Sequence, residues 1–202
     1  DDHQWLKTYF DFPDRLRLHR LDNMRVFLPS GKSYKFELDA FSGHRLQFDG
    51  FLGEKAIQAG AEIRCGEALK KIQHQSKLNR DLLVTDKGRY SCDYLIDASG
   101  SLAQVARLTK GQEDLYRPKD QIPTIYAQVQ GEIPESFDVF IGSVAPSGYA
   151  WIIPKGPNSA NVGLGVRAGK LEGNLKQHLQ TFCDDLNLEI LSWGGGWIAM
   201  GG

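Results

Sequence analysis

Short runs in which apolar and polar residues alternate recur along most of the chain, and this pattern is typical of β-strands. In the first half, the pattern predicts strands over residues 25–28, 33–38, 61–64, 68–74, 81–85 and 90–97. The first two flank a Pro-Ser-Gly turn and form a predicted hairpin, and the last four resemble a β-meander. In the second half, it predicts one antiparallel sheet from residues 124–130, 137–141, 149–153 and 161–166.

Two longer stretches have the spacing of an amphipathic helix instead. Residues 47–59 carry apolar side chains on one helical stripe and end at Gly60, a residue type that favours helix C-termini. A second stripe with spacings of three and four runs through Leu171, Leu175, Leu179, Phe182 and Leu186. It predicts a helix that covers one face of the second-half sheet. A short helix is expected at 102–108, and a glycine-rich loop at 193–202.

A charged segment punctuated by prolines, residues 110–123, separates the two halves and is predicted to be a linker. We therefore divide the chain into residues 1–110, which hold the β-meander, and residues 111–202, which hold the antiparallel sheet. Because both halves mix strands with helices, the expected fold class is α+β or α/β.

The composition excludes several classes of protein. The chain has 202 residues, of which 41% are hydrophobic, and 24 Lys and Arg against 25 Asp and Glu leave no electrostatic footprint for nucleic acid. The longest interior stretch without a charge, 139–154, is shorter than the about 20 residues that a membrane-spanning helix needs. The first residues lack the layout of a signal peptide. Isolated cysteines and scattered histidines predict no metal site, and we expect reduced thiols in a cytoplasmic protein.

The most informative segment is Tyr-Ala-Trp-Ile-Ile-Pro at 149–154, followed by Gly-Leu-Gly at 163–165. If the two strands pair symmetrically about their turn, Trp151 lies opposite Gly163 and Tyr149 opposite Gly165, all on one side of the sheet. In one interpretation, each ring shields a strand glycine and fills the core. In the other, the glycines leave a slot beside a flat aromatic wall, which suits an extended hydrocarbon or a planar ring. Spacing alone does not decide between them.

A second segment, Asp-Ala-Ser-Gly-Ser at 97–101, lies where a predicted strand meets a predicted helix. Free main-chain N–H groups and the helix dipole at such a turn favour an anion such as a phosphate. Turns of this kind are common, and Asp97 also fits an ordinary turn residue. No G-x-G-x-x-G motif occurs in the chain, and no hydrolase motif or acid–base pair predicts a catalytic side chain.

Taken in order, these segments resemble the geranylgeranyl reductase family, which belongs to the flavoproteins of the p-hydroxybenzoate hydroxylase type. The resemblance covers residues 25–202 and rests on Arg-x-x-Phe-Asp-x-x-Leu from Arg45, Gly-Ala-Glu-Ile at 60–63, Asp-Ala-Ser-Gly at 97–100 and the Tyr-x-Trp-x-x-Pro…Gly-x-Gly block. This last block is similar to the family pattern Y-x-W-x-F-P…G-x-G, with Ile153 in place of the usual phenylalanine.

The resemblance implies a partial FAD-binding domain in the first half and, in the second, a substrate domain whose helix-covered antiparallel sheet roofs the flavin. It implies reduction of C=C bonds in an isoprenoid such as a geranylgeranyl chain, with ferredoxin or NAD(P)H as electron donor. By the same resemblance, FAD contacts Arg45, Asp97, Ser99 and Gly100. The prenyl tunnel is lined by Tyr149, Trp151, Pro154, Gly163 and Gly165. Peripheral contact with a membrane is left open.

The chain also departs from the family pattern. Family members begin with a strand and a G-x-G-x-x-G turn, and they continue into a second flavin motif of the Gly-Asp type, and both motifs are outside this sequence. Ser99 stands where the family commonly has Asp, and Ala103 where it usually has Ser. We therefore interpret the chain as an internal portion of such a flavoprotein, which alone need not be catalytic. The alternatives are a module that binds an apolar ligand or a partner without redox chemistry, and an FAD-dependent monooxygenase or halogenase of the same fold.

Overall fold

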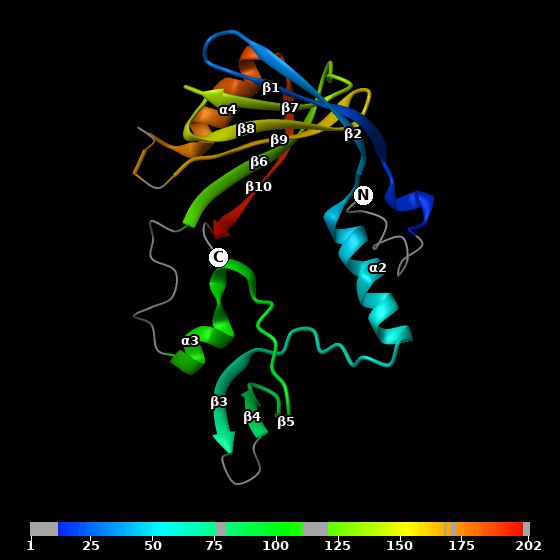
Figure 1. The fold of residues 1–202 in the computed structure, drawn as a ribbon, viewed down its shortest axis with the longest axis vertical. Coiled ribbons are helices and arrows are strands. Elements are labelled where there is room, and N and C mark those ends of the chain that lie inside the picture. The colour runs from blue at the N-terminus through cyan, green and yellow to red at the C-terminus, as the bar shows by residue number, and fades with distance from the viewer. Residues whose placement is uncertain (1–11, 76–79, 111–120, 168, 171–172, 200–202) are drawn as a thin grey trace.

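The computed structural model describes residues 12–75, 80–110, 121–167, 169–170 and 173–199. In the view of Figure 1, a seven-stranded sheet with helix α4 (Leu175–Asp185) forms the upper part. A three-stranded sheet with α3 (Gln104–Lys110) forms the lower part, and α2 (Arg45–Gln58) stands to one side. This mixture of strands and helices confirms the predicted fold class.

The large sheet has the strand order β10-β6-β9-β8-β7-β1-β2. Its strands are β1 (His19–Phe27), β2 (Ser33–Ser42), β6 (Gln121–Gln130), β7 (Phe137–Gly142), β8 (Ala145–Gly156), β9 (Ser159–Gly165) and β10 (Glu189–Ala199). Neighbouring strands are antiparallel except β1 and β7, which are parallel. The predicted hairpin and the four predicted strands of the second half are therefore confirmed.

The large sheet takes strands from both sides of the predicted division at residue 110. Strands β1 and β2 precede the division, yet β1 pairs with β7 through residues 24–27 and 137–140. The sequence does not predict this pairing of β1 with β7, because the residue pattern of one strand does not specify which distant strand lies beside it. The division into two domains stays a prediction.

The prediction of a glycine-rich loop at 193–202 is wrong as far as Ala199, because β10 pairs with β6 over this stretch. Packing within the sheet explains the glycines of β10. A Cβ on Gly194 would overlap the ring of Tyr126, and one on Gly195 would lie 2.8 Å from the main-chain oxygen of Thr124. Glycine here permits a close approach within a sheet, a role that composition alone does not distinguish from a loop. Residues 200–202 lie outside the described residues.

The small sheet confirms the meander with β3 (Leu69–Gln75), β4 (Arg80–Thr85) and β5 (Arg89–Cys92) in that order. The predicted strand at 61–64 is wrong, since these residues have no ladder and Arg64 instead donates to the hydroxyl of Tyr90 at 2.9 Å. The predicted strand at 90–97 ends early, at Cys92. Beyond it, Tyr94 and Ile96 are exposed, because no strand in the described part of the chain pairs with them.

Helix α2 confirms the first predicted helix and places Phe48, Phe51 and Leu52 on one face, whereas Ile57, which the predicted stripe also included, is exposed. This face packs on Phe12 and Leu16 in a small second core, next to the turn η1 (Asp14–Leu16). Helix α3 follows a second short turn, η2 (Gly100–Leu102), in the place of the predicted short helix. Leu171 of the second stripe and residues 111–120 of the predicted linker lie outside the described residues.

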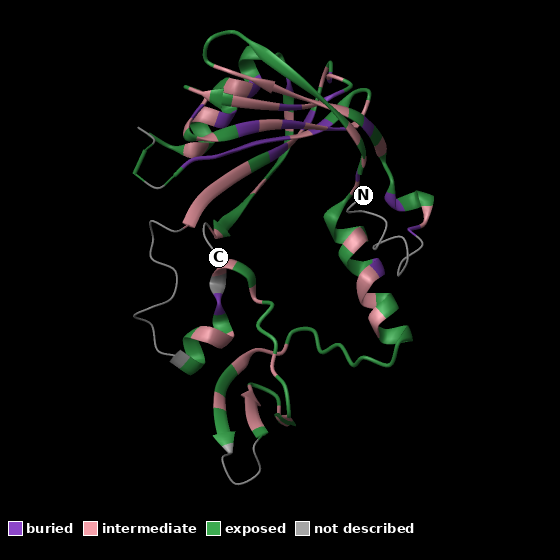
Figure 2. Cartoon of the chain, viewed as in Figure 1, coloured by how far each residue is buried: buried purple, intermediate pink, exposed green. Residues whose placement is uncertain are grey.

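Helix α4 covers one face of the large sheet, as the second stripe predicts. Leu179 and Cys183 of α4 are fully buried against the middle strands, whose buried residues are purple in Figure 2. Along β8, Ala150 and Ile152 point into this core, and the residues that alternate with them point to the other side of the sheet. We call that other side, turned away from α4, the open face of the large sheet.

Candidate ligand-binding face

A row of aromatic and glycine residues crosses the open face. Trp151 on β8 lies opposite Gly163 on β9, Gly163 lies opposite Tyr126 on β6, and Tyr126 lies opposite Gly194 on β10. The neighbouring pair Tyr149 and Gly165 is also in register. The predicted pairing of β8 with β9 is therefore confirmed at both positions.

The rings lie on the glycines rather than beside an empty slot. A Cβ on Gly163 would lie 2.7 Å from Cε2 of Trp151, and one on Gly194 would overlap Tyr126. Gly165 differs, because the nearest side chains to its Cβ position are those of Thr124 and Ile122, not that of Tyr149. Glycine thus lets each of two rings lie flat on the sheet, which agrees with the shielding interpretation.

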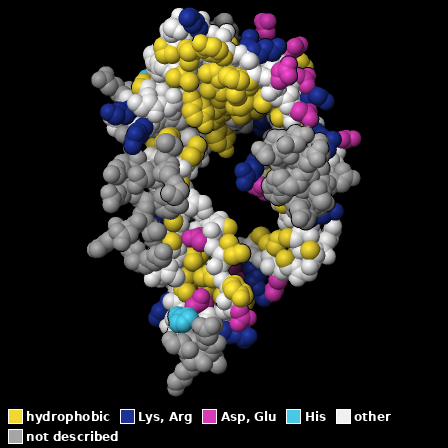
Figure 3. Space-filling view, in the orientation of Figure 1, with side chains coloured by type: hydrophobic (Ala, Val, Ile, Leu, Met, Phe, Trp, Pro, Cys, Tyr) yellow, Lys and Arg dark blue, Asp and Glu magenta, His cyan; other side chains and the backbone are white. Residues whose placement is uncertain are grey.

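An apolar wall nevertheless remains exposed. The ring centroids of Tyr149 and Trp151 are 5.9 Å apart, and the side chains of Tyr149 and Tyr126 are 45% and 38% exposed. Figure 3 shows hydrophobic side chains gathered over the region of the large sheet. A flat, partly exposed aromatic surface is the kind of wall that binds hydrocarbon chains and planar rings.

Pro154 does not share this face with the other predicted substrate-binding residues. It belongs to the core side of β8, where it is fully buried, and its carbonyl oxygen accepts a hydrogen bond of 2.5 Å from the hydroxyl of Ser42. The prediction that Pro154 lines a tunnel with Tyr149 and Trp151 is therefore wrong. Strand side chains alternate between faces, so residues 149 and 154 cannot point to the same side of a regular strand.

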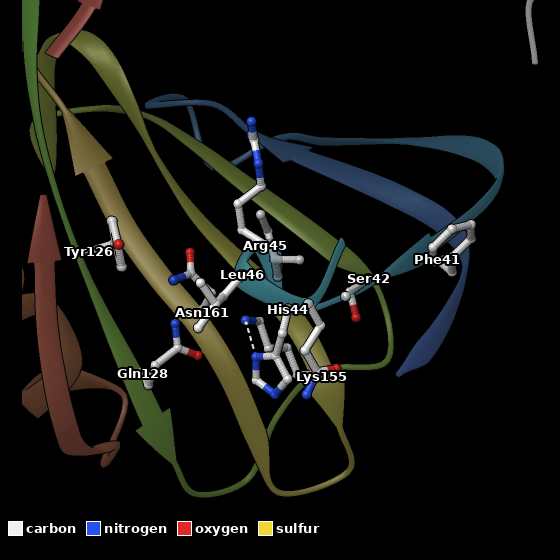
Figure 4. Close-up of a pocket in the computed structure, with 12 residues that line it drawn as sticks. Phe41, Ser42, His44, Arg45, Leu46, Tyr126, Gln128, Lys155 and Asn161 are labelled. Carbon is white, nitrogen blue, oxygen red and sulfur yellow. Dashed lines mark hydrogen bonds between the residues drawn. The ribbon is translucent and has the colours of Figure 1, made fainter. Parts of the chain in front are cut away.

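A pocket of about 720 Å³ adjoins the aromatic row where the end of β2 and the start of α2 meet the open face. The β2–α2 connection contributes Phe41, Ser42, Gly43, His44, Arg45, Leu46 and Gln47. The sheet contributes Tyr126, Gln128, Ile153, Lys155 and Asn161. In Figure 4, His44 and Lys155 meet, Gln128 and Asn161 lie on adjoining strands, and Arg45 extends away.

Lys155 and His44 form the polar centre of this pocket. Lys155 Nζ lies 3.4 Å from Nδ1 of His44, which accepts the hydrogen bond when that nitrogen carries no proton. Burial lowers the pKa of Lys155, because removing an ammonium group from water disfavours its charged form. The two residues are 111 positions apart and are brought together by the fold alone.

A hydrogen bond joins the aromatic row to the pocket. Nε1 of Trp151 donates to Oδ1 of Asn161 at 2.8 Å. An indole N–H can only donate, so the amide oxygen of Asn161 must face it, and the amide nitrogen points elsewhere. Trp151 thereby orients a polar side chain of the pocket.

The start of α2, which holds the predicted cofactor residue Arg45, has the features of an anion-binding helix end. His44 occupies the N-cap position without capping the helix through its side chain, and the first turn contains no acidic residue. Main-chain N–H groups at such an end attract anions. Arg45 is 85% exposed beside them, and its guanidinium is held by Asp49 at 2.6 Å.

The other predicted cofactor residues, Asp97, Ser99 and Gly100, make local contacts at the start of α3, and their role toward FAD stays a prediction. Oδ1 of Asp97 accepts from the Ser99 hydroxyl at 2.5 Å and from its main-chain N–H at 3.0 Å, and Oδ2 accepts from the N–H of Ala106 at 3.1 Å. These bonds lower the pKa of the Asp97 carboxyl, the Ser99 hydroxyl contributing most. Gly100 has a left-handed φ of 64°, and a Cβ there would meet no atom within 4 Å, so it forms no tight cradle. The structure thus ties Asp97 and Ser99 to the start of α3.

Of the predicted site residues, only Arg45 lines the pocket, while Tyr149, Trp151, Gly163 and Gly165 share the adjoining open face. Sequence reasoning missed Lys155 and Asn161, although a signal for both was present. Period-2 alternation from Trp151 reaches Lys155, and the symmetric pairing that matches Trp151 with Gly163 also places Asn161 opposite Ile153. His44 had no such signal.

Comparison with known proteins identifies the region that carries this face. Residues 122–196 match the family model of the geranylgeranyl reductase catalytic domain. Digeranylgeranylglycerophospholipid reductase 2 of Methanosphaera stadtmanae is 46% identical over 168 residues, which cover 80% of this chain and 40% of that protein.

Solved structures show the same fold. A geranylgeranyl bacteriochlorophyll reductase-like protein from Thermoplasma acidophilum matches with a TM-score of 0.81 at 20% identity, over 96% of this chain and 53% of that chain. The flavin-dependent halogenase CmlS matches with a TM-score of 0.68 at 17% identity, over 90% of this chain and 38% of that chain.

The fold of the chain is that of the flavoproteins of the p-hydroxybenzoate hydroxylase type. Within that class, the chain belongs to the geranylgeranyl reductase family. It spans less than half the length of the curated relatives that it matches. Among the described residues, no helix is long and apolar enough to cross a bilayer, and no cluster of potential ligands could hold a metal ion.

Proposed function

We propose that this chain supplies the substrate-binding sheet of an FAD-dependent reductase that saturates C=C bonds in a geranylgeranyl-type isoprenoid. The observation that carries the proposal is the partly exposed aromatic row of the open face, centred on Trp151 and Tyr126, within the region that matches the reductase catalytic domain. A prenyl chain has no hydrogen-bonding groups, so its binding depends on apolar contact, worth about 0.8 kcal/mol for each buried CH₂.

FAD is the cofactor that the family membership supports. The uncapped start of α2 and the exposed guanidinium of Arg45 suit its pyrophosphate or ribityl part, and the open face suits its planar ring. When bound, reduced FAD would supply a hydride to one carbon of the C=C bond, the other carbon would take a proton from water, and the flavin would be left oxidised. Apolar contact with the open face removes one side of the prenyl chain from water, and the ring of Trp151 lies along the path of the prenyl chain. Whether ferredoxin or NAD(P)H provides the electrons stays a prediction, as does contact with a membrane surface.

The test is to incubate the natural full-length protein with reduced FAD and a geranylgeranyl lipid under anaerobic conditions and to measure product masses. The expected product gains two hydrogens for each double bond reduced. Arg45→Met is expected to weaken FAD binding, measured by flavin fluorescence, without weakening lipid binding. Lipid binding without flavin binding or mass gain would support a binding module, and failure to bind any prenyl compound would refute the proposal.

A further inference from the structure

The pocket beside the aromatic row is lined by basic side chains without acidic ones. His44, Arg45 and Lys155 line it, and no acidic residue does. Arg45 has Asp49 as a counter-charge, but no ion pair in the described part of the chain includes Lys155. A partly buried ammonium group without a carboxylate costs free energy unless something else supplies negative charge. The pocket is thus suited to an anion.

Two amide side chains line the same pocket as Lys155. The amide of Asn161 is oriented by Trp151, so that its oxygen is engaged and its two N–H groups remain available. Gln128, opposite Asn161 on β6, lines the same pocket with a second amide. One ammonium and two amides present several donors on adjoining strands, which matches a phosphate with its several acceptor oxygens better than a single carboxylate.

The apolar wall leads away from these donors. On β8, Ile153, Trp151 and Tyr149 follow Lys155 on the same face, and the distance from residue 155 to residue 149 is about 20 Å along an extended strand. A ligand with its anionic end at Lys155 would therefore lay its hydrocarbon chain along the aromatic row. The open face is polar at one end and aromatic at the other, like such a ligand.

We propose that Lys155, together with the amides of Asn161 and Gln128, binds the phosphate group at the polar end of the prenyl substrate. The proposal rests on the proposed function for the identity of the prenyl chain. It makes Lys155 a specificity-determining residue, which selects phosphorylated prenyl compounds over the free alcohols.

The test compares two prenyl ligands that share the same hydrocarbon chain and differ in the presence of a diphosphate group. Geranylgeranyl diphosphate, geranylgeraniol and FAD are each titrated calorimetrically into the natural full-length protein and into its Lys155→Met variant. Lys155→Met is expected to weaken the binding of geranylgeranyl diphosphate about 10- to 100-fold, because it removes a hydrogen bond to a charged group. The affinity for geranylgeraniol should change less than about threefold, because the alcohol carries no charge. The affinity for FAD should also change less than about threefold, because the proposed function assigns its pyrophosphate to Arg45 and the start of α2 on the other side of the pocket.

Two further variants control for folding and for overall charge. Lys155→Arg keeps the positive charge and is expected to retain most of the diphosphate affinity. Lys35→Met removes an exposed charge from β2 and should leave all three affinities unchanged. Thermal unfolding of each variant checks the fold, and Lys155→Met should unfold no earlier than the parent protein, since it removes a desolvated charge that has no ion pair.

Three results would overturn the proposal. Equal losses for geranylgeranyl diphosphate and geranylgeraniol would mean that Lys155 acts by packing, and no loss for either would mean that the phosphate binds elsewhere. A loss confined to FAD would assign the site to a phosphate of the cofactor. If the parent protein bound neither prenyl compound, the proposed function would fail, and titration with inorganic diphosphate would then decide the anion site separately, with weaker binding by Lys155→Met as the supporting result.

Discussion

Gly163→Ala tests the arrangement of ring and glycine on the open face. The added Cβ would lie 2.7 Å from Cε2 of Trp151 and 2.7 Å from the main-chain oxygen of Ile125. The indole can move to relieve the first contact, but the second involves main chain in the middle of the sheet. Because overpacking of this kind costs about 1–3 kcal/mol, we expect the free energy of unfolding to fall by about 2 kcal/mol.

A double-mutant cycle with Trp151→Ala separates the two contacts. Trp151→Ala alone should cost about 2 kcal/mol, less than the about 3–5 kcal/mol of a fully buried ring, because the indole is partly exposed. In the double variant the clash with the ring is gone and the clash with Ile125 remains. The free energy of unfolding that the double variant loses should therefore be about 1 kcal/mol smaller than the sum of the losses in the two single variants.

Gly196→Ala is the matched control, since a Cβ at this β10 glycine would meet no atom within 4 Å. It should be neutral or stabilise by up to about 1 kcal/mol. All four variants and the parent are unfolded in urea and followed by far-ultraviolet circular dichroism, which does not depend on the tryptophan that is removed. The reasoning is refuted if Gly163→Ala costs no more than Gly196→Ala, or if the double variant is additive within about 0.5 kcal/mol.

Three other predictions concern stability and reactivity. Gly50→Ala should raise the free energy of unfolding by about 0.5–1 kcal/mol, because Gly50 lies inside α2 and a Cβ there meets nothing within 4 Å; a lower melting temperature would contradict this. Burial raises the pKa of the Cys183 thiol to about 11, so at pH 8 this thiol should resist labelling until the protein unfolds in urea. The exposed Cys65 should react at once, and early modification of Cys183 would contradict its burial. Arg25→Met should cost about 2 kcal/mol in urea unfolding, because it leaves the Asp138 carboxylate, 4% exposed and bonded to Arg25 at 2.6 and 2.9 Å, without its cation; Arg25→Lys should recover part of the loss, and an unchanged midpoint in Arg25→Met would refute this role.

The sequence by itself determines the local elements and one piece of register. Helix α2 follows from its apolar stripe, and the hairpin of β8 and β9 follows from period-2 alternation across a short turn. Trp151 could be placed opposite Gly163 because a symmetric turn leaves few ways to pair its flanking strands. The same pairing, extended by two residues, places Asn161 opposite Ile153, and period-2 alternation over four residues from Trp151 reaches Lys155.

Tertiary structure alone decides the rest. The glycines of β10 predict a loop from composition alone, and only the contact of Tyr126 with Gly194 in the sheet explains them. The strand predicted beyond Cys92 does not form, because it has no partner strand in the described chain. Lys155 meets His44 only because the end of β2 crosses beside β8. Local patterns record which face a side chain occupies, whereas pairing between distant segments depends on hydrogen bonds and packing that no single segment contains.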